Sequence, residues 1–393
     1  MRYIVSIFLC ITIIGCHIVT ATADELKLNA KSAAIMDENG QILYEKEGDQ
    51  KLPNASTTKI LTCLYILKHC DVEKTAMVSQ NAAMQPKVRL GVRAGEKYKV
   101  RDLLYGLMLE SYNDCAVVLA EYAAGNVKDF EKKVNQMAYE IGAKRTHFVT
   151  PNGLDGVDAH GRHETTAKDL AKIMAECIKD KEFLEITRTK QYTFSDESKK
   201  RTFTCNNHNA LLFSMDGMIS GKTGFTSKAG YCYVGAIKKN KITMTFSLLA
   251  SGWPPHKNYK WQDVKKMVQY VTDHYEQREF IADTSKIKSI NIQNGLEEKV
   301  NLKVEDQKFK MLLKKTDEIK IEAILPSSVE APIKKHQKVG EIKYMINRKC
   351  KKKVPIYTTK QVRKKDYWYY FEKIIQRFTL VSECAMIKNK NEY

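Results

Sequence analysis

Three short patterns in the sequence carry side chains that together suit acyl-transfer chemistry. The first, Ser56-Thr57-Thr58-Lys59, opens an apolar segment, and a three-residue separation on a helix puts the serine hydroxyl and the lysine amine on one face. A lysine that is largely shut off from water near the positive end of a helix has a depressed pKa, so Lys59 can accept the Ser56 proton. Alone, the pattern more often marks a serine N-cap followed by a solvated lysine.

The other two patterns add further polar groups. Ser111-Tyr112-Asn113 lies between two expected helices, where a hydroxyl and an amide can project into a cleft. Lys222-Thr223-Gly224 lies on an expected strand and supplies a cation, a hydroxyl and a glycine that permits the close approach of a ligand. A turn between edge strands is the ordinary alternative for this pattern. The joint occurrence of all three in this order is not expected by chance.

The spacing of apolar residues along the chain indicates which helices and strands position these residues. Asn39-Gly40 between two apolar runs predicts a hairpin over residues 32–47. Apolar residues between 57 and 67 occupy most of a helix circumference, which predicts a buried helix. The patterns predict further helices at 100–124 (interrupted near 111–113), 128–142, 167–177 and 261–279, and strands at 218–223, 231–238 and 242–249.

This order of elements predicts an α/β (α+β) fold. Strands at both ends with helices between them favour one antiparallel sheet with helices on both faces and a helical insertion. Beyond residue 283 short alternating segments, such as 300–304 and 319–324, predict a small β-rich domain. The sequence therefore divides into a targeting segment at 1–23, a first domain at 24–283, a β-rich domain at 284–357 and a basic tail at 358–393.

The charge distribution and the N-terminus restrict the partners. The net charge is +19, of which +13 lies beyond residue 283, and such asymmetry marks a surface that meets nucleic acid, an anionic membrane or an acidic wall polymer. Arg2 and the apolar run 3–19 are typical of a secretory signal, with Ala21 and Ala23 as a cleavage site that leaves Asp24 first. Export excludes nucleic acid as a partner. A competing lipoprotein box would place a lipid on Cys16.

Cysteines and histidines do not indicate a metal site. Eight cysteines remain after residue 23, and several lie in apolar helical stretches without a close C-x-x-C pair, which favours buried reduced thiols. There is no H-E-x-x-H pattern and no G-x-S-x-G elbow, so His147, His160, His163 and His208 are expected to be surface or structural residues. The sequence predicts no metal and no cofactor.

The three patterns taken together are the signature set of penicillin-binding proteins and class A β-lactamases. The chain resembles the serine-type D-Ala-D-Ala carboxypeptidases, the low-molecular-mass penicillin-binding proteins, over nearly its whole length. Further stretches that carry the resemblance are 150–154, 165–171, 207–212, 331–333 and 339–342. The resemblance implies a serine β-lactamase/transpeptidase-like catalytic domain at 24–283.

The resemblance also implies roles for the residues of the three patterns. Ser56 would be the acylated nucleophile, Lys59 its base and Ser111 a proton relay to the leaving amine, while Asn113 would hold the substrate amide. The oxyanion hole would consist of the backbone N–H groups of Ser56 and Phe225.

A second group of residues would bind the end of the substrate. Lys222 would lend positive potential, Gly224 would allow close approach, and Thr223 with Thr226 would bind the terminal carboxylate. Many relatives have an arginine after the K-T-G hairpin for this carboxylate. Here the corresponding stretch 257–263 offers Lys260, which lacks the bidentate fork of arginine.

The implied activity is removal of the terminal D-Ala from peptidoglycan stem pentapeptides through an acyl-enzyme, with inhibition by β-lactam antibiotics that acylate the same serine. One alternative is a β-lactamase, against which stand the missing E-x-x-L-N element and the extra β domain. The other is a catalytically idle wall-binding module, against which stands the intact set of reactive residues. The expected location is peripheral, on the extracytoplasmic face of the cell membrane.

The C-terminal tail combines a basic cluster with an aromatic-rich amphipathic helix. Apolar residues of one helix side are Tyr367, Phe371, Ile374, Ile375, Phe378 and Val381, and cations lie upstream at 349–353 and 363–365. This composition is typical of an in-plane anchor on an anionic membrane surface, and the family resemblance implies one here. Docking of the helix onto the protein itself is the alternative. The stretch is too charged to span a bilayer.

Overall fold

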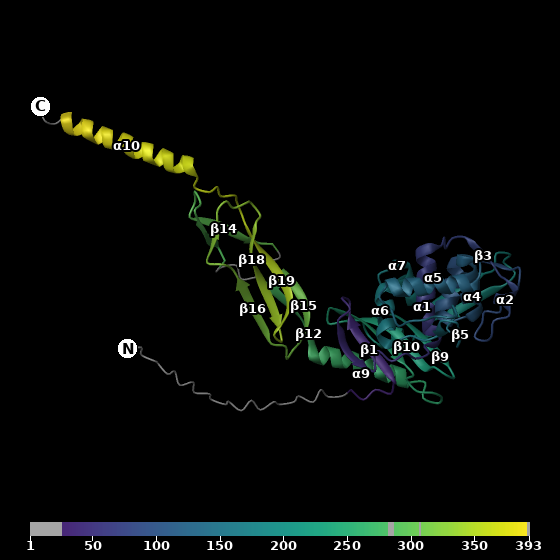
Figure 1. Cartoon of the computed structure of the whole chain (residues 1–393). Helices are drawn as coiled ribbons and strands as arrows, with labels where there is room; N and C mark the ends of the chain where they lie inside the picture. Colours follow the sequence, from purple (N-terminus) through teal and green to yellow (C-terminus); the bar gives the residue numbers. More distant parts are fainter. Residues whose placement is uncertain (1–25, 282–286, 306–307, 391–393) are drawn as a thin grey trace, which may run out of the picture.

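The computed structural model describes residues 26–281, 287–305 and 308–390. Figure 1 shows an N-terminal domain (β1 to α9), then a β domain (β12 to β19), and finally helix α10, which extends from the far end of the β domain. The predicted signal and both predicted processing sites lie outside the described residues. No helix within the described part of the chain is long and apolar enough to cross a membrane.

The N-terminal domain is built on a five-stranded antiparallel sheet in the order β2-β1-β11-β10-β9. Its strands are β1 (Ser32–Asp37), β2 (Ile42–Lys46), β9 (Met218–Thr226), β10 (Gly230–Lys239) and β11 (Ile242–Leu249). Gly40 takes the left-handed conformation that the β1–β2 turn requires. β1 pairs with β11 from Ser32 opposite Leu249 to Asp37 opposite Met244. The predicted hairpin and the predicted joining of the two ends of the domain are confirmed.

Helices cover both faces of this sheet. On one face α6 (Ala167–Cys177) contacts β1, β10 and β11, and behind it lies α1 (Lys59–His69), whose first eight residues are all buried. On the other face α9 (Tyr259–His274) packs a row of apolar residues against β10 and β11. The sequence therefore predicted the buried helix and the helix behind the sheet correctly.

The helical insertion lies between β2 and β9. Its helices are η1 (Ala55–Thr58), α1, α2 (Gln80–Ala83), α3 (Val100–Tyr105), η2 (Gly106–Glu110), α4 (Asn113–Ala124), α5 (Val127–Glu140), α6, α7 (Lys181–Arg188) and α8 (Leu211–Ser214). Three two-stranded sheets accompany them: β3 (Thr75–Met77) with β4 (Lys97–Lys99), β5 (Val157–Asp158) with β6 (Gly161–Arg162), and β7 (Gln191–Ser195) with β8 (Thr202–Asn206). The expected interruption near residues 111–113 is present between η2 and α4.

The helix predicted at 261–279 is wrong in its last part. Helix α9 ends at His274, and the next residues form β12 (Tyr275–Ile281), which pairs along its whole length with β15 (Lys308–Lys314). Tyr275 is buried and donates a hydrogen bond to the Leu43 carbonyl oxygen, while Phe280 packs in the core of the β domain. A strand partner beyond residue 300 thus outweighs the local helical pattern.

The β domain has a six-stranded sheet in the order β16-β18-β19-β14-β13-β17, packed against the β12–β15 pair. The remaining strands are β13 (Ser289–Gln293), β14 (Lys299–Val304), β16 (Ile319–Ile324), β17 (Ser328–Glu330), β18 (Lys338–Ile346) and β19 (Lys349–Thr358). The strands predicted at 300–304 and 319–324 are confirmed. Thr358 at the end of β19 is buried, as is Val362 beyond it, and the Val362 backbone pairs with Ile333.

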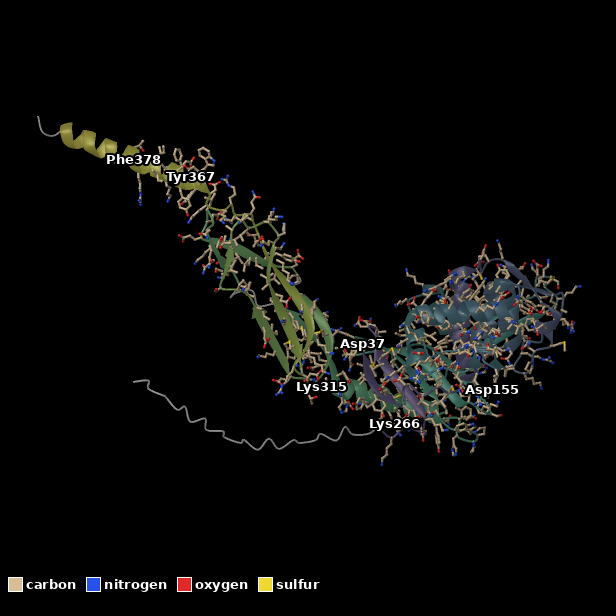
Figure 2. The ribbon with its side chains drawn as sticks, viewed as in Figure 1. Asp37, Asp155, Lys266, Lys315, Tyr367 and Phe378 are labelled. Carbon is tan, nitrogen blue, oxygen red and sulfur yellow. The ribbon has the colours of Figure 1, made fainter. Side chains whose placement is uncertain are left out.

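The described residues of helix α10 (Tyr367–Lys390) do not pack into a hydrophobic core with the rest of the protein. Tyr367 and Phe378 are labelled in Figure 2, where the helix lies apart from the other elements. The large apolar side chains of its first half are exposed: Tyr367, Trp368, Tyr370, Phe371, Ile374, Ile375 and Phe378. The alternative that this helix docks onto the protein is therefore wrong for the described side chains.

Seven of the eight cysteines in the described ranges have side chains that the structure describes, and all seven are free. Five of them are fully buried, Cys70 is half-buried and Cys350 is exposed. The expectation of buried reduced thiols is thus confirmed for most of them.

Candidate active site

Ser56 lies in η1, a single turn that leads directly into α1. The preceding residue, Ala55, has a φ of 49°, a left-handed conformation that is costly for a residue with a Cβ. Gly153 packs against this turn so closely that a Cβ on it would lie 2.0 Å from the Ala55 carbonyl oxygen. The strained turn that presents Ser56 is therefore held in place by a neighbouring loop that only glycine can complete.

The Lys59 amine lies at the centre of the three sequence patterns. Its Nζ is 2.8 Å from Ser56 Oγ, 2.8 Å from Asn113 Oδ1, 2.9 Å from the Ser111 carbonyl oxygen and 3.3 Å from Ser111 Oγ. The side chain is completely buried. The structure thus brings Ser56, Lys59, Ser111 and Asn113 together as the sequence analysis expected.

Ser111 and Asn113 are aimed at this amine by the break between η2 and α4. Ser111 ends the π-helix η2 with a φ of 68°, so the chain turns sharply and its carbonyl points at Lys59. The Asn113 side chain donates from Nδ2 to the Pro86 carbonyl oxygen at 3.2 Å, which leaves its Oδ1 for Lys59. Asn113 N–H also donates to the Val88 carbonyl oxygen, so the loop over the site is fixed by the same residue.

Burial and charge set the protonation of the two lysines in the site. Loss of hydration pulls the pKa of Lys59 well below the ordinary value for lysine, and the positive charge of Lys222 lowers it further. Burial also lowers the pKa of Lys222, to about 7. The Lys222 amine donates a 3.0 Å hydrogen bond to the Thr223 carbonyl oxygen. Lys59 therefore has the lowered basicity that a general base near neutral pH needs.

Hydrogen-bond counting orients the Ser56 proton when Lys59 is neutral. A neutral amine has two N–H groups and one lone pair, and the Ser111 carbonyl and Asn113 Oδ1 can only accept, so they take both N–H groups. Two hydroxyl groups remain near the lone pair, and Ser56 Oγ at 2.8 Å is closer to it than Ser111 Oγ at 3.3 Å. In this state the serine hydroxyl donates to Lys59.

Edge strand β9 brings the third pattern to η1. A Cβ on Gly224 would lie 3.0 Å from the backbone nitrogens of Ser56 and Thr57. The sequence analysis expected Gly224 to let a ligand come close. In the structure, the backbone of η1 occupies the space where a Cβ of residue 224 would lie. Glycine is needed here because two backbones meet.

A cavity of about 580 Å³ opens onto Ser56. Ser111, Thr223, Gly224 and Phe225 line it together with Val88, His208, Ala210, Tyr231, Lys257, Asn258, Lys260 and Trp261. Phe225 is exposed and its ring lies 4.7 Å from that of Tyr231. Lys59, Asn113 and Lys222 are buried next to this lining.

Thr226 is not part of the cavity lining. Its hydroxyl accepts a 3.1 Å hydrogen bond from Ala229 N–H and donates to Asp155 Oδ1 at 3.4 Å, at the turn that follows β9. Thr223 and Thr226 are three residues apart on a strand, so their side chains point to opposite faces. The structure therefore does not bring Thr226 together with Thr223.

Lys260 lies in the cavity wall between two aromatic rings. Its Nζ is 4.6 Å from the centre of the Tyr231 ring and 4.5 Å from that of Trp261. The residue is only 6% exposed, and burial lowers its pKa to about 8, with Lys257 adding to the effect. The rings hold the ammonium at the cavity while their faces stabilise its charge.

Sequence reasoning did not identify the buried His163 as a support of the site. Val149 N–H donates to His163 Nδ1 at 2.9 Å, which puts the ring proton on Nε2, 2.8 Å from Thr58 Oγ1. Thr58 Oγ1 in turn donates to the Ala55 carbonyl oxygen at 3.0 Å. Burial lowers the pKa of His163 to about 3, so the ring stays neutral. His163 thus connects the 149–153 loop to the strained turn before Ser56.

Asp114 was also missed, although it directly follows Asn113. Its buried carboxylate accepts hydrogen bonds from the backbone N–H groups of Leu90, Gly91 and Val92 at 2.7 to 3.2 Å. These bonds fasten the loop that carries Val88 over the cavity. Only its place after Asn113 could have drawn attention to it. Within the described residues, no group of three or more His, Cys, Asp or Glu side chains is placed to hold a metal ion.

This fold and this grouping of serine, lysine and amide define a serine acyl-transferase of the penicillin-binding class. The family model of D-alanyl-D-alanine carboxypeptidases matches residues 19–250, and that of the C-terminal domain of penicillin-binding protein 5 matches residues 275–364. The first match covers more than half of the chain. The chain belongs to the D-alanyl-D-alanine carboxypeptidase family and is a serine peptidase.

Individual relatives agree with this assignment. The chain is 28% identical over 327 residues to the D-alanyl-D-alanine carboxypeptidase DacF of Bacillus subtilis, covering 81% of this chain and 82% of that protein. It is 34% identical over 253 residues to the D-alanyl-D-alanine carboxypeptidase of Streptomyces sp. strain K15, covering 60% and 84%. Penicillin-binding protein 5 of Haemophilus influenzae has a similar structure, with a TM-score of 0.66, 25% identity and coverage of 86% and 98%.

Proposed function

We propose that this enzyme removes the terminal D-Ala of peptidoglycan stem peptides with Ser56 as nucleophile and Lys59 as general base. Neutral Lys59 takes the hydroxyl proton as Ser56 Oγ attacks the carbonyl carbon of the D-Ala-D-Ala bond. The negative charge that develops on the carbonyl oxygen is stabilised by the backbone N–H groups of Ser56 and Phe225. The observation that carries this proposal is the 2.8 Å contact between a buried, weakly basic amine and the serine hydroxyl.

The proton then returns to the leaving group. Ser111 Oγ, 3.3 Å from Lys59 Nζ, passes the proton to the amine nitrogen as the C–N bond breaks and D-Ala leaves. A water molecule hydrolyses the resulting ester, which frees Ser56 for another cycle. The Asn113 side chain contacts both Lys59 and the Pro86 carbonyl oxygen. We assign to it the positioning of the base and contact with the substrate amide.

The terminal carboxylate of the substrate binds at the positive end of the cavity. Thr223 and Lys260 line the cavity that opens onto Ser56, and Lys222 is buried next to this lining, so the three residues supply a hydroxyl and two cations. Gly224 allows β9 to approach η1. We do not include Thr226 in this subsite, because its hydroxyl is engaged with Ala229 and Asp155.

A defined pentapeptide ending in D-Ala-D-Ala tests the proposal. The wild-type protein is expected to release D-Ala and leave the tetrapeptide, as read from product masses, and to become covalently labelled by a fluorescent penicillin. Ser56→Ala should abolish both, because one nucleophile serves both reactions. Ser214→Ala, at an exposed serine outside the cavity, is the matched control and should retain both. Labelling that persists in Ser56→Ala would refute the assignment.

For location, we propose export by the N-terminal signal and peripheral attachment to the membrane through α10. The exposed aromatic and aliphatic side chains of the helix support this, as do the cations that precede it. A truncation after Asp366 removes α10 but keeps the backbone pairing of Val362 and Lys365 with the β domain. The truncated protein should stay in solution during vesicle flotation and still hydrolyse pentapeptide. If it floats with the vesicles, α10 is not the anchor.

A further inference from the structure

A second cavity, of about 450 Å³, lies beyond the turn after β9. Its lining includes Pro53, which is three residues before Ser56, and Lys228, which is three residues after Phe225. Three residues of chain span at most about 11 Å, so this cavity is within reach of a substrate held at Ser56. The Thr226–Asp155 hydrogen bond lies at its edge, because Asp155 is part of the lining.

The lining of this cavity carries charges of both signs. Arg162 and Lys228 are exposed cations, while Asp155 and Glu164 are carboxylates. Within residues 26–281, 287–305 and 308–390, none of these four side chains forms a salt bridge. Opposite charges that share a cavity without pairing with each other are available to a ligand that itself carries both charges.

The direction of the substrate chain points to this cavity. This step rests on the proposed function, in which the leaving D-Ala carboxylate lies towards Thr223 and Lys260. The acyl part of the stem peptide must then run the other way, along the backbone of β9 from Thr223 towards the Thr226–Asp155 contact at the end of this strand. The residue just before the D-Ala-D-Ala pair is the first whose side chain can reach beyond this contact.

We infer that this cavity is a subsite for the side chain of that preceding residue, and that it selects a side chain ending in both an ammonium and a carboxylate. Arg162 and Lys228 bind the carboxylate, and Asp155 and Glu164 bind the ammonium. A cation alone gains only half of these contacts, and a neutral aliphatic side chain gains none. The β5–β6 hairpin, which carries Arg162 opposite Val157, forms the outer wall of the subsite.

The preference between matched pentapeptides measures this selection. We would compare kcat/KM for peptides that differ only in the third residue, with diaminopimelate as the zwitterionic side chain, lysine as the cation and norleucine as the neutral one. Partly exposed ion pairs contribute modestly, so wild-type enzyme is expected to prefer the diaminopimelate peptide over the norleucine peptide by about five- to tenfold. The preference should shrink at high salt, because these charges are accessible to screening.

Variants separate the two halves of the subsite. The double variant Arg162→Gln with Lys228→Gln should lose the preference for diaminopimelate over lysine. Glu164→Gln should reduce the preference for lysine over norleucine, because Asp155 remains. Lys241→Gln, at an exposed lysine of the β10–β11 turn, is the matched control and should keep the wild-type ratios. The second-order rate of penicillin acylation monitors the nucleophile independently.

The outcomes distinguish the subsite from the proposed function. Equal kcat/KM values for the three peptides, with D-Ala released from each, would overturn the subsite and leave the carboxypeptidase assignment standing. Variants that slow all three peptides by the same factor would also overturn it, since that is a general loss of function rather than of selection. Failure to release D-Ala from any peptide, together with failure of penicillin acylation, would overturn both.

Discussion

The N-terminal domain and the C-terminal region use lysine in opposite ways. Lys59, Lys222 and Lys260 are buried around one cavity, and the loss of hydration lowers the pKa of each of them. In the β domain and the segment before α10 the lysines are mostly exposed, among them Lys349, Lys351, Lys353 and Lys364. A buried lysine can therefore act as a base or as a cation in a fixed position. An exposed lysine stays protonated and attracts anions over a longer range.

The difference also concerns what surrounds the amines. Lys59 is surrounded by oxygen atoms at 2.8 to 3.3 Å from three different elements, so its position is fixed. Lys343 and Lys353 of the β domain sit opposite each other on paired strands and share Glu341, at 3.6 and 3.5 Å. Such solvated contacts contribute little to stability. Substitutions should therefore have large and specific effects in the first region and small, additive effects in the second.

The largest effect is expected for Lys59→Arg. A guanidinium keeps the positive charge but does not lose its proton, so it cannot serve as the base for Ser56. General-base catalysis contributes about 10²–10⁴-fold, and D-Ala release and penicillin acylation should both fall by this order. Stopped-flow acylation and product analysis measure the two rates.

A matched control lies at the other end of the same helix. Lys68→Arg changes an α1 lysine that only forms a surface ion pair with Glu176, so it should leave both rates unchanged. If Lys59→Arg slows acylation by less than about tenfold, or roughly 1.4 kcal/mol of barrier, another group deprotonates Ser56.

The next effect in size is expected for Lys260→Gln. The variant removes a charge that the Tyr231 and Trp261 rings hold at the cavity, and a hydrogen bond to a charged group is typically worth about 1.5–3 kcal/mol. We expect kcat/KM for the pentapeptide to fall by about ten- to a hundredfold, mostly through KM. A substrate amidated at its C-terminus should be unaffected by the substitution, as should the control Lys265→Gln on the exposed face of α9. An equal loss with the amidated substrate would contradict carboxylate binding.

The pH profile is expected to depend on the same two cations. The pKa is lowered to about 7 for Lys222 and to about 8 for Lys260, so both are charged below pH 7 and both lose their protons as the pH rises through 7 to 8. Carboxylate binding should weaken over this range, and kcat/KM, which reports the free enzyme, should decline by up to about tenfold per pH unit above it. The amidated substrate should lack this alkaline decline. An identical decline for both substrates would assign it to a group other than these lysines.

The sequence predicted what depends on local pattern and on motifs, and it missed what depends on distant partners. The S-x-x-K spacing correctly brought Ser56 and Lys59 together, because helix geometry alone fixes that relation. The role of His163 was not visible, since its partners Val149 and Thr58 come from separate segments and no pattern links them. The strand β12 was missed for the same reason, because β15 is separated from it along the chain.

Sequence reasoning also missed which segments of the chain pack closely together. It recognised that Gly224 allows something to come near, but only the structure shows that this is the backbone of η1. It also grouped Thr226 with Thr223, although alternation along β9 sends the two side chains to opposite faces. Likewise, residues 358–365 read as part of the basic tail, whereas Thr358 and Val362 are buried against the β domain.

The smallest effect on catalysis is expected from the cations just before α10 and in its first half. Changing Lys364, Lys365, Lys373 and Arg377 to Gln should leave pentapeptide hydrolysis unchanged and weaken binding to anionic vesicles, by up to about fivefold for each charge, since headgroup attraction is worth roughly 1 kcal/mol per cation. The apolar side chains of the helix remain, so flotation should be reduced rather than abolished. High salt should reproduce the effect in the wild-type protein, because attraction is screened beyond a Debye length of ~8 Å.

A control variant tests whether the position of these charges matters. Changing the exposed Lys51, Lys74, Lys181 and Lys241 to Gln lowers the net charge equally but should keep the binding. If both quadruple variants lose affinity equally, overall charge and not the α10 region attracts the protein to the membrane.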